Sequence, residues 1–97
     1  MKYRIELTED AKEDLSWFRV HERRIILDAV KANLSYEPLI ETRHRKPLEE
    51  NPLGAWELCV QKYRVFYDVE RGDMVKIGAI GHKVHNMLYV RGQEVEI

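Results

Sequence analysis

Apolar and charged residues alternate at the start of the chain and then change to a helical spacing. The period of two over Tyr3 to Leu7 predicts a half-buried strand. Thr8 follows as a helix N-cap, because its hydroxyl can accept a hydrogen bond from a first-turn N–H. The apolar residues behind it share one helical face: Ala11, Leu15 and Phe18. The chain is therefore predicted to open with a strand that leads directly into an amphipathic helix.

A second helix is predicted from about Glu22 to Tyr36, after a short break near Val20 and His21. Its apolar positions recur with the helical period. The residues of this face are Ile26, Leu27, Val30 and Leu34. Pro38 prevents the helix from running on. Two helices joined this closely are expected to form an antiparallel hairpin.

The second half of the chain changes to a strand pattern. Glu37 to Gly54 contains all three prolines and is predicted to be a long loop. Three strands are then predicted in quick succession, over Ala55 to Gln61, Tyr63 to Glu70 and Met74 to Ile80. The first two alternate between apolar and polar residues, and short turns join the three. In the tail, Leu88 to Val90 is expected to be extended, and Val95 and Ile97 can form one more short strand.

This order of elements predicts one α+β domain over residues 1–97. An N-terminal strand and a two-helix hairpin precede a mostly antiparallel sheet of three to four strands. One face of that sheet packs against the helices. The other face is left for solvent or a partner.

Composition and charge narrow the class of protein. The chain has 97 residues, of which 44% are hydrophobic and 34% charged, as in a globular domain rather than a disordered segment. No apolar run is long enough for a membrane helix, and the acidic N-terminal segment does not look like a signal peptide, so a cytoplasmic location is expected. A single cysteine excludes an internal disulfide. The net charge of −1 argues against binding to nucleic acid by bulk charge alone.

An ordered set of short segments resembles the RelE/ParE toxin superfamily of type II toxin–antitoxin systems. The set covers about residues 3 to 90, and the strand segment followed by the Gly-His-Lys segment weighs most. Its segments are Lys46-Pro47-Leu48, Trp56-Glu57-Leu58, Tyr63-Arg64-Val65-Phe66-Tyr67 and Ile80-Gly81-His82-Lys83. The resemblance implies a RelE-like fold, similar to that of microbial ribonucleases. It also implies a cognate antitoxin as partner, which we expect to be small and acidic.

The resemblance implies two alternative activities. RelE-type members cleave messenger RNA on the ribosome without a metal or cofactor, whereas ParE-type members inhibit DNA gyrase. Cleavage by the RNA 2′-hydroxyl needs a base, a cation that stabilises the phosphate, and an acid. We therefore expect a metal-independent messenger RNA endoribonuclease. A ParE-like toxin, or a weakly active toxin fold that acts mainly as an antitoxin-binding partner, is the alternative.

Arg64 is the first catalytic candidate. Strand alternation places it opposite Tyr63 and Val65, on the open face of the sheet, and a guanidinium fork matches phosphate oxygens. The alternative is a surface arginine paired with Glu57 or Asp68. By the resemblance, Arg64 corresponds to a catalytic arginine. The resemblance likewise makes Lys83 a substitute for a second arginine and Tyr89 a residue that stacks on the substrate base. Tyr89 can equally be ordinary packing under the tail.

The chain also departs from the RelE pattern. RelE-type enzymes carry two lysines on the open face of the strand that contains Glu57 and Cys59 in this sequence. Histidine is the obvious substitute for a proton-transfer group, so His82 and His85 are further catalytic candidates. The alternative for both is a partly exposed histidine in a polar segment. Arg43, Arg45 and Lys46 form a basic cluster that can grip an RNA backbone, or is simply solvated.

Overall fold

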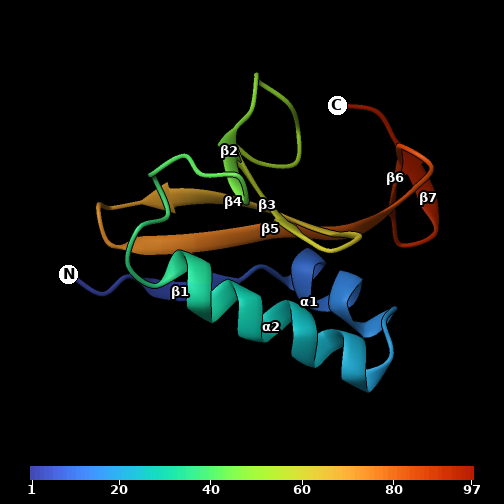
Figure 1. Ribbon diagram of the computed structural model, residues 1–97, viewed down its shortest axis with the longest axis horizontal. Helices are drawn as coiled ribbons and strands as arrows, with labels where there is room; N and C mark the ends of the chain where they lie inside the picture. Colours follow the sequence, from blue (N-terminus) through green and yellow to red (C-terminus); the bar gives the residue numbers. More distant parts are fainter.

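The computed structural model describes residues 1–97 and has two helices beneath a curved sheet (Figure 1). Its elements in chain order are β1 (Arg4–Leu7), α1 (Glu9–Ser16), α2 (Val20–Leu34), β2 (Arg45–Pro47), β3 (Trp56–Val60), β4 (Tyr63–Glu70), β5 (Met74–Val84), β6 (Met87–Val90) and β7 (Gln93–Val95). The predicted α+β class is confirmed. Neither helix is long and apolar enough to cross a membrane.

The sheet has seven strands rather than the three to four predicted. Their order is β2-β3-β4-β5-β6-β7, all antiparallel, and β1 pairs in parallel with β5 off this path. The long strand β5 therefore has two partners on the same side. β1 lies beside Met74 to Ile77, and β6 lies beside His82 to Val84. The molecule depends on this strand for most of its long-range pairing.

An irregularity in β5 changes which residues face the helices. Tyr67 pairs with Ile77 and Phe66 pairs with Ala79, so Gly78 is an extra residue in the ladder. Such a bulge shifts the alternation of side chains by one position. As a result, Ile77 and Ile80 both belong to the core on the helix side, whereas Ala79 faces the other way.

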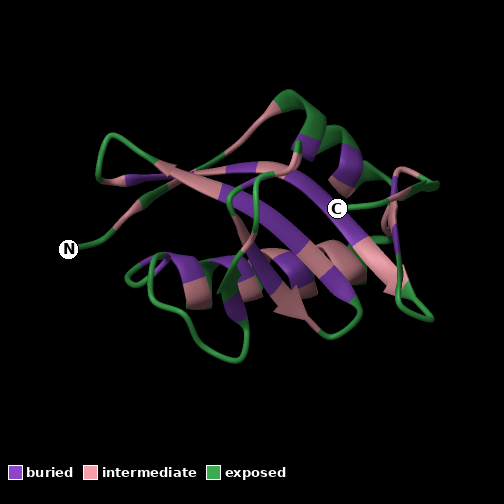
Figure 2. Cartoon of the chain, turned by 90° about the horizontal axis from the view of Figure 1, so that it is seen from above, coloured by how far each residue is buried: buried purple, intermediate pink, exposed green.

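The larger core lies between the helices and the sheet. Buried residues run along the middle strands and the inner sides of the helices, while the loops are exposed (Figure 2). The fully buried side chains of this layer come mainly from α2, β4 and β5, and Tyr67 is the largest of them. The predicted apolar face of the second helix is confirmed by its buried residues Ile26, Val30 and Leu34.

The other face of the sheet is not left open over its whole length, as the sequence had suggested. A second, smaller cluster lies there, and the β6–β7 hairpin and the loop before β3 contribute to it. Its buried members are Phe66, Ala79, Leu88 and Val90, with Leu48, Leu53 and Val95 packed around them. The hairpin approaches closely because Gly81 has no side chain. A Cβ there would lie 2.4 Å from the backbone oxygen of Tyr89.

Three predicted boundaries need correction. The predicted loop Glu37 to Gly54 contains the short strand β2, which pairs with β3 despite ending at Pro47. Proline is tolerated there because β2 is an edge strand. The helix α2 begins at Val20, two residues earlier than predicted, and the break falls before it. Strand β5 runs four residues beyond Ile80, to Val84.

The N-terminus of α2 is tied to the sheet through Glu22. One carboxylate oxygen accepts a hydrogen bond from the backbone N–H of Arg19 at 3.2 Å, half of a capping box. The other accepts from the hydroxyl of Tyr63 at 2.6 Å, and Lys62 Nζ lies 3.8 Å away. The Tyr63 hydrogen bond and the Arg19 amide lower the pKa of the Glu22 carboxyl below its ordinary value of 4.5. Burial and the same carboxylate raise the pKa of Tyr63 to about 12.

We predict that Gly81→Ala destabilises the protein. The new methyl group collides with the backbone of β6 rather than with a flexible side chain, so the hairpin must move away from Phe66. Such overpacking costs on the order of 1–3 kcal/mol. The control is Gly72→Ala in the β4–β5 turn, where nothing lies within 4 Å and only the positive φ of 76° opposes a side chain. Urea unfolding measures both. Equal and small losses of unfolding free energy in the two variants would contradict the close approach at Gly81.

We also predict that part of the stability depends on the ionised form of Glu22. Because the pKa of this carboxyl is lowered in the folded state, its contribution is present above about pH 4.5, and it is lost as the pH falls through the lowered value. Glu22→Gln should therefore flatten the acid limb of a plot of melting temperature against pH. Tyr63→Phe removes the first cause of the shift and should flatten it in part. An unchanged acid limb in both variants would contradict this linkage.

Candidate functional site

Arg64 lies where the sequence places it, on the face of the sheet away from the helices. It pairs across the sheet with Cys59 on β3 and Gly81 on β5. Its guanidinium curls over the β3–β4 turn, where Nη1 donates to the carbonyl oxygens of Gln61 and Tyr63, each at 2.8 Å. It makes no ion pair with Glu57 or Asp68. The side chain is thus oriented through one nitrogen, and Nη2 makes no hydrogen bond within the chain.

A compact polar group surrounds Arg64 on this face. Glu57 is buried, with only 2% exposed, and its Oε1 atom lies 3.5 Å from Lys46 Nζ on the neighbouring strand β2. The same oxygen accepts a hydrogen bond from the thiol of Cys59 at 3.4 Å. Burial, followed by the charge of Glu57, raises the pKa of the Cys59 thiol, so the thiol stays protonated near neutrality. We call Lys46, Glu57, Cys59 and Arg64 the open-face cluster.

His44 immediately precedes β2, the strand that carries Lys46 of the open-face cluster. Its backbone oxygen accepts from the N–H of Cys59 at 2.8 Å, so the β2–β3 ladder extends one residue beyond Arg45. Arg45 points inward, and strand alternation therefore turns the exposed imidazole of His44 toward the face of Lys46. This placement of His44 cannot be predicted from the sequence, whose pattern predicts a loop over Glu37 to Gly54.

Lys83 projects from the same side of the sheet as Arg64 but lines a different hollow. Gly81 and Lys83 are two positions apart in β5, so both have the facing of Arg64. The hollow of Lys83 lies along the β6–β7 hairpin and measures about 440 Å³. Its walls include Met87, Glu94 and Glu96, and Arg64 is not among them. Lys83 and Arg64 therefore share a face of the sheet, but only Lys83 lines this hollow.

His82 and Tyr89 lie on the opposite face, toward the helices. They are direct cross-strand partners, and their rings stack with centroids 5.8 Å apart. The ring of Phe18 meets that of His82 edge-on at 5.9 Å. These contacts place His82 beside a small cavity of about 240 Å³ that Glu22, Lys62 and other residues also line. The sheet therefore separates His82 and Tyr89 from Arg64, and the predicted catalytic residues do not form one surface.

His85 occupies the two-residue turn between β5 and β6. Both turn residues have positive φ, 50° at His85 and 72° at Asn86, as a type I′ hairpin turn requires. The imidazole is exposed and makes no hydrogen bond. His85 thus lies at the tip of the β5–β6 turn.

The basic cluster is divided in the same way. Arg43 is exposed and Lys46 belongs to the open-face cluster. Arg45 is only 8% exposed, and its guanidinium donates to the carbonyl oxygens of Ile40 at 2.9 Å and Asn33 at 2.6 Å. It fastens the segment after α2 to the end of that helix. Arg43 and Lys46 are the members of this cluster whose ammonium or guanidinium groups reach solvent.

The charged groups of the open-face cluster suit phosphate chemistry. No three histidine, cysteine, aspartate or glutamate side chains gather where they could hold a metal ion. The open-face cluster instead combines an oriented guanidinium, an ammonium and a carboxylate on adjacent strands. A guanidinium fork and an ammonium can hold phosphate oxygens, and a carboxylate can accept a proton.

The fold matches a solved structure. The chain superposes with a TM-score of 0.70 on a chain of the crystal structure of the toxin–antitoxin complex RelBE2 from Mycobacterium tuberculosis. The two sequences are 25% identical, and the match covers 86% of this chain and 100% of the other. No protein-family model and no curated protein matches the chain. The resemblance expected from the sequence is therefore confirmed: the chain has the fold of the RelE/ParE toxin superfamily.

Proposed function

We propose that the protein is the toxin of a type II toxin–antitoxin system and that it cleaves messenger RNA on the ribosome. The observation that carries this proposal is the open-face cluster, in which Arg64 is oriented by two carbonyl oxygens and is free of carboxylates. The similarity to a chain of a toxin–antitoxin complex supports the first half of the proposal. The second half is supported by the chemistry that this surface can perform.

In the proposed reaction the 2′-hydroxyl of a ribose attacks the adjacent phosphorus. The bond from phosphorus to the 5′-oxygen breaks, which leaves a 2′,3′-cyclic phosphate and a 5′-hydroxyl. Charge builds up on the phosphate oxygens in the transition state, and the Nη2 group of Arg64 would stabilise it there, because Nη1 already donates to two carbonyl oxygens and Nε is buried. Lys46 would supply a second positive charge across the cluster.

Proton transfer falls to groups on the same face as Arg64. Glu57 is a carboxylate whose one oxygen contacts Lys46 and Cys59. It would accept the 2′-hydroxyl proton once Lys46 turns to the phosphate. The imidazole of His44, exposed beside Cys59, would then protonate the leaving 5′-oxygen. His82 and His85 stay candidates for the general acid or base, Tyr89 for stacking on the substrate base, and Lys83 for a second cation that contacts the phosphate.

We propose an acidic antitoxin as the partner and the cytoplasm as the location. An acidic segment laid over the open-face cluster would neutralise Arg64 and Lys46 and exclude RNA by charge and by volume. The ribosome and its messenger RNA would be the target of the free protein.

One observation favours the ParE-like alternative, in which the protein inhibits DNA gyrase by binding alone. Glu57 and Cys59 occupy positions where RelE-type enzymes carry lysines, and the carboxylate of Glu57 offsets the charge of Lys46. A surface with less positive charge binds RNA less strongly. The same reduced positive charge would also explain a weakly active toxin fold that chiefly binds its antitoxin.

We predict that Arg64→Ala abolishes growth arrest on induced expression and leaves messenger RNA intact. Loss of one electrostatic donor to a transition state costs about 10²–10³ in rate. The readouts are growth and the mapped 5′ ends of messenger RNA in ribosome-bound fractions. Arg24→Ala is the matched control, since it removes an exposed arginine of α2 that faces away from the sheet. It should behave as the wild type does.

Two outcomes would overturn the ribonuclease proposal. In the first, wild type and Arg64→Ala arrest growth equally while messages stay intact. In the second, the arrest comes with DNA damage signalling and continued translation, which would favour gyrase as the target. Thermal unfolding of the purified variants shows that each is folded. Arg64→Lys, which keeps the charge and loses the fork, should fall between the two.

A further inference from the structure

We propose that Cys59 is a positioning residue of the open-face cluster. Its thiol holds one oxygen of the Glu57 carboxylate and leaves the other oxygen facing the surface as the proton acceptor. The reaction that Glu57 serves rests on the proposed function, whereas the positioning is a property of the folded chain and can be tested without RNA.

The two carboxylate oxygens of Glu57 have different surroundings. Oε1 lies 3.5 Å from Lys46 Nζ and accepts the hydrogen bond from Cys59 Sγ at 3.4 Å, whereas Oε2 makes no hydrogen bond within the chain. The buried side-chain atoms without a partner are Asp14 Oδ1 and Arg64 Nε, so Oε2, which also lacks one, reaches the surface. A residue that is only 2% exposed thus presents one unpartnered oxygen to the open face.

Cys59 is the more constrained of the two partners of Oε1. It lies two positions beyond Glu57 on β3, so strand alternation puts both side chains on the same face, and one torsion sets the position of the thiol. Lys46 lies on the edge strand β2, and its long, flexible side chain is 53% exposed. Once Lys46 turns to the phosphate, the thiol is the remaining partner of Oε1. A buried carboxylate with no donor at all would be strongly unfavourable.

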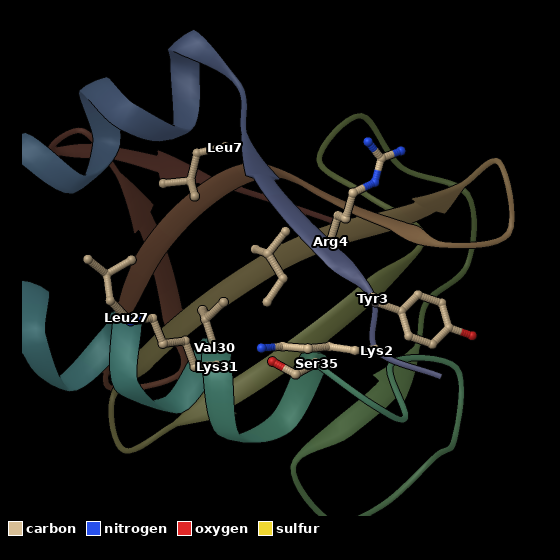
Figure 3. A pocket seen from close by; sticks show the side chains of 9 residues that line it. Lys2, Tyr3, Arg4, Leu7, Leu27, Val30, Lys31 and Ser35 are labelled. Carbon is tan, nitrogen blue, oxygen red and sulfur yellow. The ribbon is translucent and has the colours of Figure 1, made fainter.

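The thiol is suited to donate a hydrogen bond rather than to react. Burial, and then the charge of Glu57, raises the pKa of Cys59, and the thiolate is the form that acts as a nucleophile. A thiol is also a weak donor. It therefore orients the carboxylate of Glu57 and leaves that carboxylate a better proton acceptor than a hydroxyl donor would. The apolar groove between β1 and α2 lies elsewhere on the molecule and takes no part in this contact (Figure 3).

Charged and titratable groups face Glu57 from both neighbouring strands. Each of them can shift its titration through the electric field, but the only hydrogen bond that the carboxylate accepts on this face comes from the Cys59 thiol. The groups are Lys46 on β2, Arg64 and Asp68 on β4, and His44 just before β2. Because all of them are the same in the wild type and in a Cys59 variant, a difference between the two proteins reports the thiol.

The first test uses the S–H stretching band in the infrared spectrum of the full chain. The chain has one cysteine, so a single band reports Cys59. The band lies at lower frequency when the thiol donates to a carboxylate. We expect it to rise in Glu57→Gln, and to rise in the wild type as acid protonates Glu57. A band that keeps its frequency in Glu57→Gln would overturn the proposal. This measurement needs no Cys59 variant, so it decides the question even if such a variant unfolds.

The second test follows the titration of Glu57 through the NMR signal of its carboxyl carbon. Cys59→Ala removes the donor, so the midpoint should move to higher pH by about half a unit or more, because the hydrogen bond favours the ionised form. Cys59→Ser supplies a stronger donor and should move the midpoint below that of the wild type. The matched control is Val60→Ala, which shortens the next side chain of β3 on the helix side and should leave the midpoint unchanged. Equal shifts in the alanine and serine variants, or none, would overturn the proposal.

Cleavage of messenger RNA on purified ribosomes gives a separate readout. Cys59→Ala should cleave about tenfold more slowly, with the acid limb of its pH–rate profile moved to higher pH, and Cys59→Ser should restore the rate to within about threefold. If the wild type leaves messages intact while the thiol band and the carboxyl titration behave as expected, the proposed function fails and the positioning of Glu57 stands. If the wild type cleaves and Cys59→Ala cleaves equally with the same acid limb, the positioning role fails and the proposed function stands.

Discussion

The fold depends on the hydrogen bonding along one edge of β5. Two strands, β1 and β6, pair with that edge, and they leave a gap between them. β1 ends its pairing at Ile77, and β6 begins at His82. The helix α1 fills the interval with side chains. The buried carboxylate of Asp14 accepts the N–H of Ile80 at 2.9 Å, and its other oxygen lies 2.8 Å from Nε of Arg91 in the β6–β7 turn. Burial raises the pKa of Asp14, although that amide and Arg91 both favour the ionised form. One side chain thus joins helix, central strand and hairpin. Removing Arg91 would leave the buried carboxylate of Asp14 without its charged partner, whereas Arg91 also lies 3.4 Å from Glu13 and 3.8 Å from Asp10.

This junction also decides what lies on each face of the sheet. With the hairpin held at its turn by α1, β6 crosses close over Gly81 and packs Leu88 against Phe66. The hairpin therefore occupies part of the face on which Arg64 lies, and Lys83 is drawn into the hollow beneath it. The open-face cluster remains on the side of β2 and β3. A site assembled around Arg64 is thus bordered on one side by the β6–β7 hairpin.

The sequence predicts the parts of this fold that local periodicity controls. Alternation finds β1, β3 and β4, and the helical period finds both helices, since each element buries one regular face. Arg64 is placed on the correct face for the same reason. The extra residue at Gly78 escapes prediction, because a bulge shifts the alternation without a mark in the pattern. The resemblance groups Tyr89 with Arg64, and His82 is a candidate because a histidine can transfer protons, whereas the register puts both on the helix side. Arg45 could not be separated from its basic neighbours, because only the tertiary fold brings the carbonyl oxygens of Ile40 and Asn33 to its guanidinium.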